Sequence, residues 1–168
     1  MVLTFVIAGL FLFAAAVFLW SILSPALRLK GREPEAVDLQ SYLNLLDPAQ
    51  LEYLKLHTTS AQYRELLRHR RRALAAYLQQ MARSSALALQ AADTVLAATP
   101  APEMELAARR LVSAALDTRT YALNGLLFLR FGSFLPGEVA WLQKTAVHYQ
   151  TFNEALVGRG FTALSPSR

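Results

Sequence analysis

An uncharged apolar segment at the start of the chain, residues 2–23, constrains the fold more than any other feature. A helix of this length is about 33 Å long, and the hydrocarbon core of a bilayer is about 30 Å thick. A helix also satisfies its own backbone hydrogen bonds, as a segment surrounded by lipid must. The segment therefore predicts a single transmembrane helix. Its anchoring side chains are expected to be Val2, Phe5, Phe11, Phe18, Trp20 and Leu23.

A cleaved signal peptide is the alternative interpretation of this segment. No lysine or arginine precedes the apolar run, and the run is longer than the apolar part of a usual signal peptide. Pro25 interrupts the small residues at which cleavage would occur, and it disfavours helical geometry in the residue before it. We therefore predict an uncleaved anchor over residues 1–24.

Three basic residues, Arg28, Lys30 and Arg32, follow the anchor, whereas the α-amino group is the only positive charge before it. The positive-inside rule places the more basic side in the cytoplasm. We expect a single-pass protein of a bacterial inner membrane that contacts lipid through its N-terminal helix. Its N-terminus would lie outside and its helical domain in the cytoplasm, joined by a juxtamembrane linker over residues 25–38.

The composition of the chain excludes several kinds of chemistry. Cysteine is absent, so disulfides, thiolate nucleophiles and thiolate metal sites are excluded. The formal net charge of +5 favours attraction to an anionic leaflet but is modest for a nucleic-acid-binding protein. We expect no cofactor and no nucleic-acid partner.

Local capping signals divide the rest of the chain into helices. Asp47 followed by Pro48 predicts a short helix to about residue 57, and Thr59 with Gln62 predicts the start of a long helix to about residue 98. Two further helices are predicted over residues 103–131 and 136–158, and a weaker one over residues 36–46.

The apolar spacing in these segments is helical throughout, and no alternating strand pattern occurs. We therefore predict an all-α fold. The transmembrane helix would be followed by an antiparallel bundle of three main helices with one or two short ones. The bundle domain would span residues 39–160, with a C-terminal tail over residues 161–168.

The long helix carries a seam of residues at alternating spacings of four and three, the period of left-handed bundle packing. The seam consists of Tyr63, Leu67, Arg70, Leu74, Tyr77, Met81, Ser84, Ala88, Ala91 and Val95. We interpret it as packing against the following two helices. A homodimeric coiled coil is the alternative, but an arginine and several alanines at the seam give little volume for knobs-into-holes packing.

Four arginines of the long helix, Arg64, Arg68, Arg71 and Arg72, share one helix face. One interpretation is a contact with an anionic partner such as a lipid headgroup, a phosphate or RNA. The other is a solvated face, partly paired with Glu65. No aromatic residues alternate with these arginines to stack on bases, which disfavours nucleic acid.

A second apolar concentration lies near residue 130, where Phe128, Phe131 and Phe134 recur at every third position. This segment is too short to cross a bilayer. It is interpreted either as a helix end that closes the core or as a hydrophobic contact surface for a partner or the membrane interface.

No catalytic or metal-binding pattern occurs in the sequence. His57, His69 and His148 lack the spacing of metal ligands and are interpreted as structural or exposed residues. An enzyme with a site assembled from separate residues, such as Asp117, Arg119 and His148, is the least favoured alternative.

The sequence therefore favours a membrane-tethered scaffold or assembly protein without catalytic activity. It would bind a partner protein, or a second copy of itself, through the helical bundle. The alternative is a membrane-anchored module that binds lipid or another hydrophobic ligand.

Overall fold

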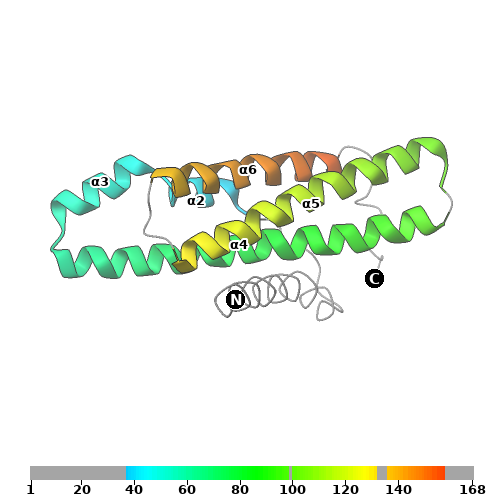
Figure 1. The fold of residues 1–168 in the computed structure, drawn as a ribbon. Helices are drawn as coiled ribbons and strands as arrows, with labels where there is room; N and C mark the ends of the chain where they lie inside the picture. Colours follow the sequence, from blue (N-terminus) through cyan, green and yellow to red (C-terminus); the bar gives the residue numbers. More distant parts are fainter. Residues whose placement is uncertain (1–36, 99, 132–135, 158–168) are drawn as a thin grey trace, which may run out of the picture. The chain divides into compact units, whose positions relative to one another are not determined.

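The computed structural model describes residues 37–98, 100–131 and 136–157. They form five helices, α2 (Leu39–Asn44), α3 (Pro48–His57), α4 (Ser60–Ala97), α5 (Pro102–Phe131) and α6 (Pro136–Val157), shown in Figure 1. No strand occurs within these ranges. The prediction of an all-helical domain is thus confirmed for the part of the chain that is described.

The predicted transmembrane helix, its anchoring side chains and the basic residues Arg28, Lys30 and Arg32 lie outside the described residues. The predicted tail over residues 161–168 also lies outside them. None of the helices that the structure describes is long and apolar enough to cross a membrane. The anchor and the orientation of the chain therefore stay predictions.

The helix starts follow the local capping chemistry. The Asp47 carboxylate accepts a hydrogen bond from the Ala49 amide at 2.9 Å, with Pro48 in the first turn of α3. Thr59 and Gln62 form a reciprocal capping box at the start of α4. Each side chain satisfies a backbone amide that has no partner within the helix, so both starts coincide with the predicted ones.

The bundle consists of α4, α5 and α6, with α5 packed against both other helices (Figure 1). Gly125 of α5 lies against Leu78 of α4 and Leu142 of α6, and a Cβ atom at this glycine would come within 3.0 and 3.1 Å of their side chains. Further along, the Thr118 hydroxyl donates to the His148 carbonyl at 3.0 Å. As the residue numbers rise in α5 they fall in α6, so these two helices are antiparallel.

The short helix α2 packs against α6 and adds buried residues to the core of the bundle. The Tyr42 hydroxyl donates to the Leu142 carbonyl at 2.9 Å, and the Val37 amide donates to the Tyr149 hydroxyl at 3.4 Å. Burial of the Tyr42 phenol raises its pKa above the ordinary value. The largest fully buried apolar side chains are Tyr42, Leu46, Leu74, Leu78, Met81, Leu111, Leu142, Tyr149 and Phe152.

The predicted seam of α4 is confirmed in part. Arg70, Leu74, Met81, Ser84 and Ala88 are buried as expected. At two positions of the seam the next residue along the helix is buried instead. Leu78 is buried rather than Tyr77, and Ala92 is buried rather than Ala91. Tyr63, Leu67 and Val95 are only partly buried. A helix in a globular core buries a wider stripe than a coiled-coil seam, so adjacent positions share the interface.

The N-terminal part of α4 extends beyond the bundle. Because Gly125 lies against Leu78, the end of α5 at Phe131 reaches about the level of Arg72. Before that point α4 is accompanied by α3, which packs against it only lightly (Figure 1). No residue between Pro48 and His69 is buried. We call α3 together with residues 60–69 of α4 the arm.

Arg70 marks the boundary between the arm and the bundle. It is the first buried residue of α4. Its Nε donates to the Leu45 carbonyl, and its Nη2 donates to the Asn44 carbonyl at 2.8 Å. These carbonyls lie at the end of α2, so one side chain joins α4 to α2. Burial lowers the pKa of the Arg70 guanidinium.

Candidate functional site

The arm exposes large apolar side chains. The exposed fraction is 60% for Tyr53, 74% for Leu56 and 41% for Leu66. On the opposite side of α3, Leu51 and Leu54 are partly covered. A helix with apolar residues on two sides is typical of one that is covered on both, whereas the described residues cover only one side of α3.

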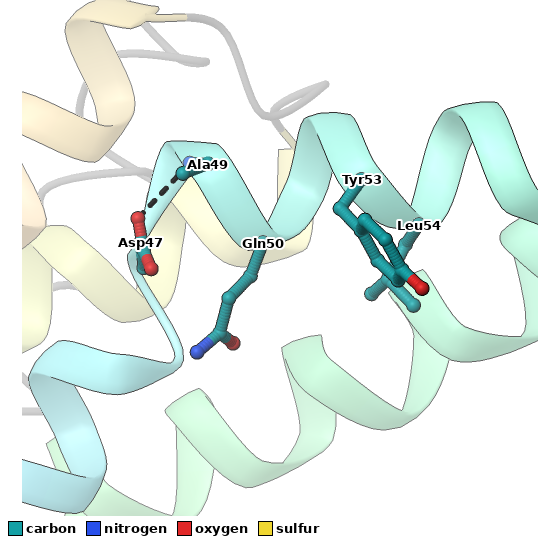
Figure 2. Close-up of a pocket in the computed structure, with 5 residues that line it drawn as sticks. All are labelled: Asp47, Ala49, Gln50, Tyr53 and Leu54. Carbon is teal, nitrogen blue, oxygen red and sulfur yellow. Dashed lines mark hydrogen bonds between the residues drawn. The ribbon is translucent and has the colours of Figure 1, made fainter.

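A surface pocket of about 380 Å³ lies on α3 (Figure 2). Its lining consists of Asp47, Ala49, Gln50, Tyr53 and Leu54, which come from one short stretch of chain. The Asp47 carboxylate, as the dashed line in Figure 2 marks, is engaged by the Ala49 amide. Ligand sites usually enclose most of their ligand with several elements, so this hollow supports surface contact better than enclosed chemistry.

The four arginines predicted to share one face of α4 differ in their exposure to solvent. Arg64, Arg68 and Arg72 are exposed, whereas Arg71 is half-buried and its Nε is shielded from solvent. Arg71 lies three and seven residues before the buried Leu74 and Leu78, on the side of α4 that faces the bundle. We call the three exposed residues the arginine ridge.

Glu65 does not neutralise the arginine ridge. Its carboxylate lies 3.9 Å from the Nε2 atom of His69, one turn further along α4. Arg64 instead donates through Nε to the Ser60 carbonyl at 3.2 Å. Neither this ion pair nor that of Arg109 with Glu105 involves the ridge.

The predicted phenylalanine cluster is described only at Phe128. This side chain is 39% exposed and lies edge-on to Trp141 with a centroid distance of 5.7 Å. Phe131 is the last residue of α5, and Phe134 lies outside the described residues. Whether the three phenylalanines act together stays a prediction.

Sequence reasoning missed a stack of aromatic rings between α5 and α6. Tyr121 stacks on Trp141 at 4.7 Å and on His148 at 4.0 Å. The Nε1 atom of Trp141 is buried and has no hydrogen-bond acceptor. Aromatic residues recur seven positions apart on both helices, at 121 and 128 and at 141 and 148, and this spacing is the signal that could have predicted the stack.

The three residues of the enzyme alternative differ in their surroundings. Asp117 is exposed, Arg119 is buried on the other side of the same helix, and His148 stacks on Tyr121. Burial lowers the pKa of the Arg119 guanidinium. No group of residues that could hold a metal ion occurs in the described part of the chain.

The two other histidines lie in the arm. The Nδ1 atom of His57 lies 2.8 Å from the Tyr53 carbonyl, with the two rings stacked, and His69 contacts Glu65. Both are exposed residues with local partners along their own helix.

Comparison with known proteins returned no match to a family model, to a curated protein or to a solved structure. The surfaces of the arm and the bundle are therefore the features that bear on function.

Proposed function

We propose that this chain is a membrane-tethered helical scaffold without catalytic activity, which binds a partner protein or a second copy of itself through the arm. The observation that carries the proposal is the absence of any buried residue between Pro48 and His69, together with the exposed Tyr53 and Leu56. Large apolar side chains gathered on one element mark interaction surfaces more often than scattered ones do.

In this proposal the bundle is the rigid support and the arm is the contact surface. Tyr42, Leu142 and Arg70 connect α2 to the bundle through hydrogen bonds, so the start of α3 is held in place. The predicted anchor over residues 2–23 would keep the arm near the cytoplasmic face of the membrane.

Site-specific photo-crosslinking in cells tests this proposal. A photoreactive residue at Leu56 is compared with one at Val147, an apolar position on α6 that is 63% exposed. We expect a discrete crosslinked species from Leu56 and little from Val147, because exposure is similar but Leu56 lies on a helix with no buried residue, whereas α6 already packs against α5. Mass spectrometry of the product distinguishes a partner protein from a second copy. Equal or absent crosslinking at the two positions would contradict the proposal.

The second candidate function is binding of a lipid or another hydrophobic ligand by the membrane-anchored module. The pocket on α3 favours it only weakly, because its lining residues come from one stretch of chain and several of them are exposed. The exposed arginines of α4 give a stronger connection to lipid, through headgroup charge rather than through a cavity.

A further inference from the structure

We propose that the arginine ridge, Arg64, Arg68 and Arg72, is a docking surface for the anionic headgroups of a phospholipid bilayer. The three residues are spaced four apart on α4, so their Cα atoms follow one line about 12 Å long. All three are exposed. A linear set of cations matches a flat, uniformly charged surface better than it matches one compact anion.

The charge of the ridge has no counterpart within the described residues. Glu65 is the only carboxylate between Ser60 and Arg72, and it contacts His69. Arg109 on α5 shows the contrasting case, because its guanidinium lies 2.8 Å from the Glu105 carboxylate. The ridge is therefore available for external anions, whereas Arg109 already has an ion-pair partner.

Two features favour lipid over a nucleic acid. No phenylalanine, tyrosine or tryptophan lies between Arg64 and Arg72, so the ridge itself has no such ring on which bases could stack. The chain between Leu23 and Val37 spans at most about 48 Å when extended. If residues 2–23 cross the membrane, as the proposed function holds, the arm therefore stays within reach of the headgroups, and each cation near an anionic leaflet strengthens the attraction.

The test uses the full chain in lipid nanodiscs with a reporter beside the ridge. The chain has no cysteine, so Ala61→Cys introduces a unique labelling position, exposed and seven residues before Arg68 on the same face. A fluorophore at this position is quenched by a spin label on the lipid headgroups. We expect stronger quenching with about 30 mol% phosphatidylglycerol than with phosphatidylcholine alone, and loss of the difference in about 1 M salt, where the Debye length is about 3 Å.

A variant in which the charges of the ridge are reversed is compared with a control variant. The control changes the same amount of charge at exposed positions of α5 and α6. The ridge variant is Arg64→Glu, Arg68→Glu and Arg72→Glu, and its neutral counterpart has glutamine at the same positions. The control is Arg109→Glu, Arg110→Glu and Lys144→Glu, all at exposed positions. Each cation near the surface contributes roughly a fivefold factor, so we expect the neutral glutamine variant to lower the binding constant for the anionic surface by on the order of a hundredfold, and the charge-reversed variant to lower it further.

Several outcomes would overturn the docking surface. The proposal would be contradicted if quenching did not depend on phosphatidylglycerol, or if the control variant lost as much signal as the ridge variant. Binding of an RNA oligomer that depends on the ridge, without any response to lipid charge, would assign the ridge to nucleic acid. Extraction of the chain by alkaline carbonate tests the tether separately. A chain that resists extraction but shows no charge-dependent quenching keeps the proposed function and loses this inference.

Discussion

The arm and the bundle both consist of α-helices and differ in what covers them. In the bundle, α5 is packed between α4 and α6, and side chains such as Leu78 and Phe152 are almost fully buried. In the arm, α3 and the start of α4 contact each other lightly and bury no residue. The same helix α4 belongs to both regions, so helix formation alone does not determine which part has a core.

The difference shows how length mismatch between neighbouring helices creates a surface. α4 has 38 residues and α5 has 30, and their contact at Gly125 and Leu78 leaves the excess at the start of α4. Burial stabilises the part that α5 covers, at about 25 cal/mol for each Å² of apolar surface. The uncovered part keeps its apolar and cationic side chains exposed, and these are the groups that a partner or a membrane would contact.

The largest expected effect is a difference in the free energy of unfolding between a substitution in the bundle and one in the arm. Phe152 is 1% exposed and packs against Tyr149, so Phe152→Ala should lower the free energy of unfolding by about 3–5 kcal/mol through the cavity that it leaves. Leu56→Ala in the arm should change it by less than about 0.5 kcal/mol. Thermal unfolding of the full chain in mild detergent, followed by circular dichroism, measures both. A comparable loss for Leu56→Ala would show that the arm is covered in the intact protein.

A smaller effect is expected at the boundary residue. Arg70→Met removes two charged hydrogen bonds to the carbonyls of Asn44 and Leu45, and rehydration of these carbonyls offsets part of the loss. We expect a cost of about 2 kcal/mol in the free energy of unfolding. Faster amide hydrogen exchange in residues 37–46 should accompany it, because α2 would lose its link to α4.

Arg70→Lys is the matched control for this boundary. A lysine keeps the charge but has one donor group where arginine has a planar fork, so it should recover only part of the lost stability. Unchanged exchange in α2 after Arg70→Met would mean that Tyr42 and Val37 alone hold α2 in place.

The boundaries of the helices could be predicted from sequence because capping is local chemistry. Asp47 with Pro48, and Thr59 with Gln62, determine where α3 and α4 begin through contacts within a few residues. The role of Arg70 could not be predicted in this way. Its partners lie 25 and 26 residues earlier in the chain, and only the packing of α2 brings them together.

The exposure of the candidate site could also not be predicted from local sequence. A helical projection treats Arg64 and Arg71 as members of one face, but Arg71 is half-buried on the side of α4 that carries Leu74 and Leu78, whereas Arg64 is exposed. Exposure at this face depends on which side of α4 the other helices cover, and no local pattern contains that information. Likewise, the exposure of the apolar side chains of the arm can be recognised only when the helices that pack against α3 are known.

The smallest expected effect concerns whether the arm unfolds independently of the bundle. Thr59→Ala removes the capping box of α4, which should cost about 1 kcal/mol of local helix stability. Since the first turns of α4 lie beyond α5, the loss should appear as faster amide exchange in residues 61–66 while the melting temperature of the bundle changes little. Thr94→Ala is the control, because the Thr94 hydroxyl donates within the helix to the Gln90 carbonyl and caps nothing. A melting temperature that falls with Thr59→Ala, but not with Thr94→Ala, would mean that arm and bundle unfold as one cooperative unit.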